Sequence, residues 1–346
     1  MPLLGMRSLT LRSLHSPRSA ARSSPRAVLS LSRALSQTKM DRTSLIKDLR
    51  ARTAAPMKKC VEALDKASGD LEEAISELRK IGLATAQKKA SRGAHDGVVC
   101  LARSDHAAAL VEINSETDFV ARNQTFQSLA SSIARTALHS VDVASASSQA
   151  VEIDTSVVST ATLEGDTVPV AEALGVAVGQ LGENLVLRRG FVLAEPTSGG
   201  VVCSYVHNTY SPNVGRTAAM VSLASTAQDR TALESLGTRI AMHIVAASPL
   251  YLNQESVPAD ALQKEIQILK EQALGEGKPE KIVNKMVEGR LKKYYSEMCL
   301  LEQQFLIDED AGSIKKVLAT ASKELGATVK LESFARLHVG ESSPSV

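Results

Sequence analysis

The sequence contains no Trp and only five Phe and five Tyr among its 346 residues, so its interior must be built largely from Ala, Leu and Val. No uninterrupted apolar run approaches the roughly 18 residues that a membrane span requires. The four cysteines, Cys60, Cys100, Cys203 and Cys299, lie far apart and form no C-x-x-C pair. This spacing speaks against a zinc knuckle or a redox dithiol and favours small buried side chains that stay reduced.

Residues 1–40 contain no acidic side chain but carry seven basic ones among many serines and leucines. This composition is typical of a mitochondrial transit peptide, and the scattered leucines do not form the continuous apolar core of a secretory signal. A basic tail that binds nucleic acid is the alternative. Without this segment, 33 basic residues face 38 acidic ones, a net charge near −5. An acidic body argues against direct binding to nucleic acid, and we expect none.

The sequence lacks the motifs that carry common chemistries. It has no G-x-x-x-x-G-K-[ST] phosphate loop, no H-E-x-x-H, no G-x-S-x-G and no kinase motifs. Its seven histidines are dispersed, and His207 and His243 are the two with the most suggestive positions. A hydrolase that uses either histidine would have no nucleophile or metal set beside it. We therefore expect no enzyme activity, no catalytic residue, no metal and no cofactor.

Residues 41–92 are predicted to form a three-helix module and a linker. A first helix is expected over about residues 45–52, a second begins at Pro56, and Asp70 with Glu73 forms a capping box for a third. The very short connections indicate a compact bundle that resembles a ubiquitin-associated domain. Residues 80–92 are interpreted as the linker.

An internal repeat follows, with the period of strands. Residues 97–100, Gly-Val-Val-Cys, recur as residues 200–203, and each copy continues with a second strand, a helix and a returning strand. The predicted class is therefore α+β: a duplicated core of hairpin plus helices, in subdomains 93–195 and 196–346. Residues 256–300 of the second copy are expected to insert an antiparallel helical hairpin that seals most of its apolar surface on itself.

Residues 114–123, Asn-Ser-Glu-Thr-Asp-Phe-Val-Ala-Arg-Asn, stand where the second strand of copy one enters its helix. Copy two has no acidic residue followed by an aromatic at the matching place, so the shared fold does not require Asp118 and Phe119. Two interpretations stay open. Phe119 and Phe126 are seven residues apart and could share a buried helix face, or Phe119 could serve a task outside the core.

Several segments resemble elongation factor Ts, a family that carries T-D-F-V at this corner. The similarity covers roughly residues 44–340 and includes, in family order, residues 45–64, Gly182-Glu183-Asn184 with Arg188-Arg189, residues 240–249, and residues 277–290. Together with the first 40 residues, the resemblance identifies a mitochondrial member of the family, located in the matrix.

The resemblance implies a guanine-nucleotide exchange factor that releases GDP from mitochondrial elongation factor Tu. Its partner would be elongation factor Tu in both the GDP-bound and the nucleotide-free form. No contact with a membrane is expected. Phe119 would be a wedge beside the Mg²⁺ site of the partner, and Asp118 a polar lever. The other implied partner-binding residues are Thr117, Val120, Arg122, His207, Leu49, Arg52 and Met57.

Two departures from the family pattern concern the partner surface. Thr53-Ala54-Ala55-Pro56 stands where the family usually has Thr-Gly-Ala-Gly, and the chain stops soon after Glu341, without the additional C-terminal helix of bacterial members. A ubiquitin-binding adaptor is the competing interpretation of the N-terminal module, and the transit segment argues against it.

Overall fold

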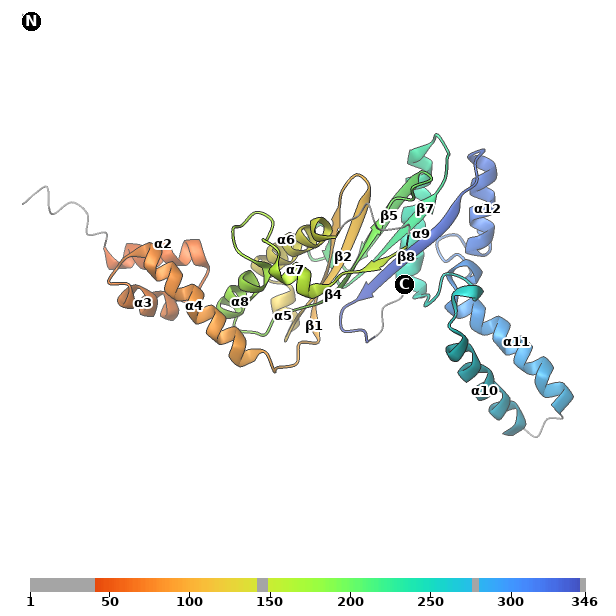
Figure 1. Cartoon of the computed structure of the whole chain (residues 1–346), viewed down its shortest axis with the longest axis horizontal. Helices are drawn as coiled ribbons and strands as arrows, with labels where there is room; N and C mark the ends of the chain where they lie inside the picture. The colour runs from red at the N-terminus through yellow and green to blue at the C-terminus, as the bar shows by residue number, and fades with distance from the viewer. Residues whose placement is uncertain (1–40, 142–148, 276–279, 343–346) are drawn as a thin grey trace, which may run out of the picture.

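The computed structural model describes residues 41–141, 149–275 and 280–342. The expected transit peptide, residues 1–40, lies outside the described residues. The chain is elongated, with a helical module at one end, two sheets in the middle and a helical hairpin that projects at the other end (Figure 1). It is a mixed helix and sheet protein, as predicted.

The N-terminal module consists of α2 (Arg42–Thr53), α3 (Met57–Lys66) and the start of α4 (Leu71–Lys89). Pro56 precedes the first residue of α3, and the Asp70 side chain accepts the Glu73 N–H at the start of α4, so both expected helix starts are confirmed. The module has its own small core, which contains Leu49, Cys60 and Leu64.

The predicted linker over residues 80–92 is wrong for residues 80–89, which continue α4. This part of α4 packs along α8 (Val170–Leu181), where Gly82 lies against Gly179. A Cβ atom on Gly179 would come within 2.5 Å of the Gly82 Cα, so only glycine permits this approach. Side chains of the module add hydrogen bonds to the core, including one of 2.7 Å from Lys59 Nζ to the Gly179 carbonyl.

The first sheet has the order β3-β4-β2-β1-β6 and the second the order β5-β7-β8. Their strands are β1 (Asp96–Arg103), β2 (Ala107–Ser115), β3 (Val151–Glu152), β4 (Val186–Ala194), β5 (Gly200–His207), β6 (Val214–Gly215), β7 (Thr217–Ala224) and β8 (Lys330–His338). The repeated hairpins are β1-β2 and β5-β7, and β4 and β8 are the returning strands. Because β6 of the second half pairs with β1, the division into subdomains at residue 195 stays a prediction.

The two sheets lie face to face between two helical layers. Leu110 and Phe191 of the first sheet pack with Met220 and Leu337 of the second. The outer face of the first sheet is covered by α6 (Gln124–Ser140) and α8, with the short α7 (Thr155–Thr160) beside them. The outer face of the second is covered by α9 (Arg230–Ala247) and α12 (Ile314–Glu324). Strand β2 is consequently buried on both faces along its whole length.

The predicted hairpin is formed by α10 (Ala259–Gly275) and α11 (Glu280–Met298), and the expected turn at residues 276–279 lies outside the described residues. Leu269 and Ala273 of α10 pack against Val283 and Val287 of α11. Ile268 and Leu274 remain about half exposed. The hairpin therefore closes most of its apolar surface on itself.

Candidate functional site

The site begins where β2 ends and a one-turn helix, α5 (Asp118–Ala121), turns the chain into α6. Val120 and Ala121 point into the core, so the expected direct contact of Val120 with a partner is wrong, whereas the Phe119 side chain is 81% exposed. Phe126, one turn into α6, is completely buried. The interpretation of Phe119 as a core residue is therefore wrong: the corner presents its ring to solvent.

Glu183 and Asn184, from the loop between α8 and β4, hold this corner. The Thr117 hydroxyl donates to Glu183 Oε1 over 2.6 Å, and the Thr117 N–H donates to Glu183 Oε2 over 3.0 Å. The Asn184 N–H donates to Glu116 Oε1 over 2.7 Å and is the main cause that lowers the pKa of the Glu116 carboxyl. The residues just before Phe119 are thus fixed by two carboxylates that accept backbone N–H groups.

A second contact ties the corner to the other half of the protein. Arg122 lies 3.4 Å from the Asp118 carboxylate, and its guanidinium stands over the Tyr210 ring at 5.6 Å from the centroid. Tyr210 also interacts with the side chain of Arg216, and this interaction is the main cause that raises the pKa of the Arg216 guanidinium. Arg122 is therefore held by an acidic side chain and an aromatic ring at once.

His207 ends β5 and is exposed, in the same connection that carries Tyr210. Its Nδ1 lies 3.2 Å from the Tyr205 hydroxyl, and the two rings are tilted at 6.0 Å between centroids. No carboxylate contacts His207 among the described residues, so nothing there equips it as a general base.

The three expected partner residues of the N-terminal module differ in accessibility. Leu49 is completely buried, so its expected direct contact with a partner is wrong: its side chain packs the module instead. Arg52 is exposed and pairs with Glu72 at 2.9 Å. Met57 is 53% exposed beside Lys47 and Arg50, around a shallow hollow of about 450 Å³. The accessible surface here is basic with an apolar centre.

Elsewhere in the described part of the chain, the four cysteines and His243 are buried. No three His, Cys, Asp or Glu side chains of that part gather in a metal-binding arrangement. Burial raises the pKa of all four thiols, to about 11 for Cys203 and Cys299. His243 is buried between Gln303 and the Leu306 N–H. Among the described helices, none is both long and apolar enough to cross a membrane.

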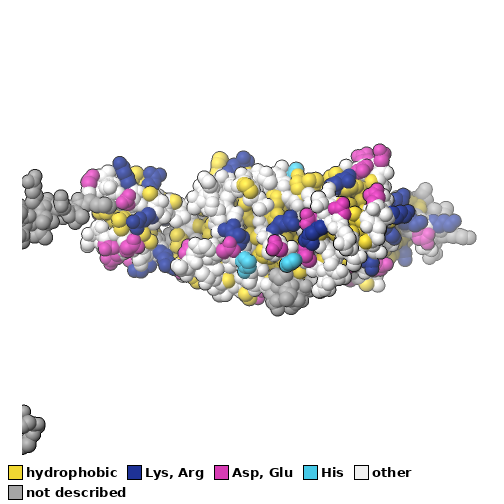
Figure 2. Space-filling model, turned by 90° about the horizontal axis from the view of Figure 1, so that it is seen from above, with side chains coloured by type: hydrophobic (Ala, Val, Ile, Leu, Met, Phe, Trp, Pro, Cys, Tyr) yellow, Lys and Arg dark blue, Asp and Glu magenta, His cyan; other side chains and the backbone are white. Residues whose placement is uncertain are grey.

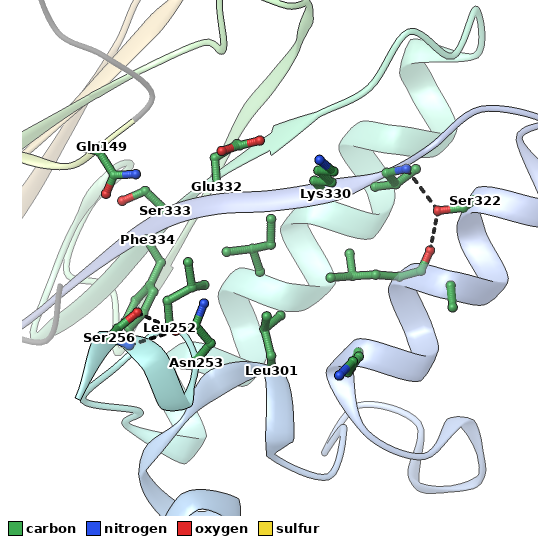
Figure 3. A pocket seen from close by; sticks show the side chains of 15 residues that line it. Gln149, Leu252, Asn253, Ser256, Leu301, Ser322, Lys330, Glu332, Ser333 and Phe334 are labelled. Atoms are coloured by element: carbon green, nitrogen blue, oxygen red, sulfur yellow. Dashed lines mark hydrogen bonds between the residues drawn. The ribbon is translucent and has the colours of Figure 1, made fainter. Parts of the chain in front are cut away.

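A groove of about 740 Å³ lies between β8 and α12, and Gln149 from the first half also lines it (Figure 3). Some of its polar groups bond one another: the Ser322 hydroxyl accepts the Val329 N–H, and the Asn253 side chain accepts from both the N–H and the hydroxyl of Ser256. Over the face seen in Figure 2, basic and acidic side chains are interspersed on both the module and the core. On that face, no continuous basic patch is seen among the described side chains.

Comparison with known proteins decides the family. The pattern of the family described as elongation factor TS matches residues 116–341, which begin at the Phe119 corner. The elongation factor Ts of Paramagnetospirillum magneticum is 44% identical over 299 residues, 86% of this chain and 91% of the relative. The mitochondrial elongation factors Ts of Ricinus communis and Oryza sativa subsp. indica are 42% and 43% identical and match 87% of this chain, with 81% and 79% of the relatives covered.

This chain belongs to the elongation factor Ts family. Its role is accordingly that of a nucleotide exchange factor in translation elongation, and its mitochondrial relatives indicate a mitochondrial protein. The alignments reach well beyond the residues that the family pattern matches, so the resemblance includes part of the chain before residue 116.

Sequence reasoning missed two residues of this elongation factor Ts corner. In the sequence, Glu183 stands out only as part of the Gly-Glu-Asn segment, and nothing there connects it to Thr117, 66 residues earlier. Tyr210 carried no signal at all. The one feature that points to Glu183 is the position of its carboxylate, between Gly182 at the end of a helix and the strand that follows.

Proposed function

We propose that this chain releases GDP from mitochondrial elongation factor Tu by inserting Phe119 beside the Mg²⁺ site of the partner. The observation that carries the proposal is the 81% exposure of an aromatic ring on an otherwise buried and hydrogen-bonded corner. Burying such a ring in a partner pocket can contribute about 1.5–3 kcal/mol. That energy is available only where the ring finds a pocket.

Exchange by this route needs no bond to be made or broken by the chain. A GTPase holds its nucleotide through phosphate-binding backbone groups, a Lys and Mg²⁺. A protein that binds the nucleotide-free partner more tightly than the loaded one weakens the affinity for GDP by the same factor, since coupling is reciprocal. Phe119 and Asp118 would displace the side chains and waters that hold the metal, and Arg122 would anchor the turn behind them.

Two further surfaces are proposed to contact the partner: His207, at the end of β5 just before the connection that carries Tyr210, and Arg52 with Met57, which give the N-terminal module a basic and apolar face. Beside Phe119, the partly exposed Thr117 is proposed to contact the partner, whereas the buried Val120 supports the turn from inside. Leu49 supports that face from inside. Because they belong to different parts of the elongated chain, these contacts would span a wide area of the partner.

The proposal is tested by stopped-flow release of a fluorescent GDP analogue from mitochondrial elongation factor Tu. Phe119→Ala should slow the stimulated release by at least about tenfold, as loss of a buried aromatic anchor predicts. Asp118→Ala should slow it less, because the wedge remains. A Phe119→Ala protein that is as active as the parent would refute the wedge.

For localisation, we propose that residues 1–40 direct the protein to the mitochondrial matrix and are removed there. A fluorescent reporter that carries these residues should accumulate in the matrix. Accumulation in the cytosol or nucleus would contradict this part of the proposal.

A further inference from the structure

The Glu183 carboxylate is shared between two donors of a single residue. Its Oε1 accepts the Thr117 hydroxyl over 2.6 Å, and its Oε2 accepts the Thr117 N–H over 3.0 Å. Both residues are only partly exposed. Thr117 is the residue immediately before α5, two positions from Phe119. The direction in which α5 leaves the sheet is therefore linked to a side chain from the far end of subdomain 93–195.

The second copy of the repeat is an internal control for this contact. Asn114 of β2 pairs with Val186 in the first sheet, and Ala224 of β7 pairs with Lys330 in the second. Both ladders have a bulge at the same position, which begins two residues before Asn114 in β2 and two residues before Ala224 in β7. Counting from these pairs, Ala227 corresponds to Thr117 and Ala327 corresponds to Glu183. Ala227 has no hydroxyl to donate and Ala327 has no carboxylate to accept, so the contact has no counterpart in copy two.

The copy-two corner nevertheless folds, because a local partner replaces the carboxylate. The Ala227 N–H donates to the Ser225 Oγ over 3.1 Å. Copy one keeps the matching serine, Ser115, but its hydroxyl donates instead to the Thr117 carbonyl over 2.9 Å. A strand-to-helix corner of this type thus satisfies its N–H without help from a distant glutamate. Glu183 is an addition that occurs in the copy with the exposed aromatic residue.

An exposed side chain such as Phe119 can act as a wedge only if the turn that carries it resists displacement. When Phe119 meets a partner, any rotation of α5 away from the contact would dissipate the binding energy, whereas a preorganised turn delivers it. The contact from Asn184 N–H to Glu116 lies directly beside the Glu183 contact and supports the same turn from the neighbouring residue pair. The loop itself is fixed on one side by Gly182, whose φ of 80° ends α8.

We propose that Glu183 is a positioning residue for nucleotide exchange: its carboxylate holds Thr117 so that Phe119 is presented rigidly to the partner. This inference rests on the proposed function of Phe119. It assigns Glu183 no contact with the partner or its nucleotide.

The central experiment is a double-mutant cycle on the release of a fluorescent GDP analogue from elongation factor Tu, measured well below the melting temperature of each variant. Glu183→Ala should slow release by at least about tenfold, because it removes both charge-assisted hydrogen bonds to Thr117. In the Phe119→Ala background, the same change should have less than about a twofold effect, because the residue that it positions is gone. Equal slowing in both backgrounds would overturn the proposal.

The control is Glu195→Ala. Glu195 directly follows β4 and, like Glu183, uses both carboxylate oxygens, in contacts with His106 and Arg230 far from the corner. Its loss should leave release unchanged. A second pair of variants avoids changing the loop: Thr117→Val removes only the hydroxyl contact, and Thr117→Ser retains it. Release by Thr117→Ser should be faster than release by Thr117→Val, and equal rates would count against the proposal.

Amide hydrogen exchange of the free protein tests the positioning without the partner. Glu183→Ala should accelerate exchange at the Thr117 N–H and through α5, while protection of the adjacent strand β2 stays unchanged. Unchanged protection at Thr117 would overturn the positioning role of Glu183 even if Phe119→Ala slows release. If Phe119→Ala does not slow release but Thr117 protection is lost in Glu183→Ala, the proposed function fails and the positioning role fails with it, leaving only a structural contact.

Discussion

Arg189 donates from Nε to Glu112 Oε2 over 2.7 Å, and the two side chains are only 8% and 0% exposed. Arg188 reaches the other oxygen of Glu112 over 3.0 Å, and the Gly340 N–H donates to the same oxygen over 2.9 Å. Glu112 stands at the bulge of β2, between the two sheets. One buried carboxylate therefore joins β2, β4 and the end of the described chain.

Glu112→Ala should lower the free energy of unfolding by about 3–5 kcal/mol, because it leaves a buried guanidinium without its counterion. Glu72→Ala is the control, since it breaks the exposed Arg52–Glu72 pair and should cost less than about 1 kcal/mol. Urea unfolding of both variants makes the comparison. Similar losses for the two would show that burial of Glu112 has no energetic consequence.

Phe119→Ala should leave stability within about 0.5 kcal/mol of the parent, as expected for an exposed side chain. Phe126→Ala, seven residues later, should cost about 3–5 kcal/mol because its ring is completely buried. Thermal melts of the two variants test the structural difference between these phenylalanines. Strong destabilisation by Phe119→Ala would mean that its effect on exchange is an effect on folding.

His243 should make the protein less stable in mild acid. Its Nδ1 accepts the Leu306 N–H over 3.2 Å, so Nε2 carries the hydrogen that faces Gln303 Oε1 at 2.9 Å, and burial lowers the pKa of the imidazole from 6.5. A lowered pKa in the folded state means that the stability is complete above the unfolded pKa and is lost as the pH falls below it. The melting temperature should consequently fall between about pH 7 and pH 5.5.

The test for His243 is the variant His243→Asn, which keeps an acceptor for Leu306 and cannot take up the proton. It should be less stable than the parent at neutral pH, and the difference should shrink toward about pH 5.5. His338, whose pKa burial also lowers, remains in both proteins and contributes equally. A difference that stays constant with pH would exclude His243 as the source.

Ala54→Gly should stabilise the N-terminal module. Ala54 ends α2 in the left-handed region, with φ 51° and ψ 12°, and its N–H donates to the Arg50 carbonyl over 2.8 Å. Glycine removes the steric cost of that conformation, a gain of about 1 kcal/mol. Ala51→Gly, inside the same helix, should have the opposite sign and a similar size. Urea midpoints of the two variants should therefore move in opposite directions.

The sequence alone determined the features that depend on neighbouring residues. The Asp70 cap, the start of α3 after Pro56 and the two repeated hairpins were predicted correctly because each follows from local hydrogen bonds or from a short-range apolar period. The family resemblance likewise came from motifs that are contiguous in the chain.

Only the tertiary structure decided what depends on distant residues. Residues 80–89 continue α4 along α8, where Gly82 allows the close approach, and Leu49 is inaccessible because three helices close around it. The exposure of Phe119 and the contact between Thr117 and Glu183 depend on how β2, β4 and α8 come together. A periodic pattern shows which residues share a face, but whether that face is covered is determined by packing against segments far away in the sequence.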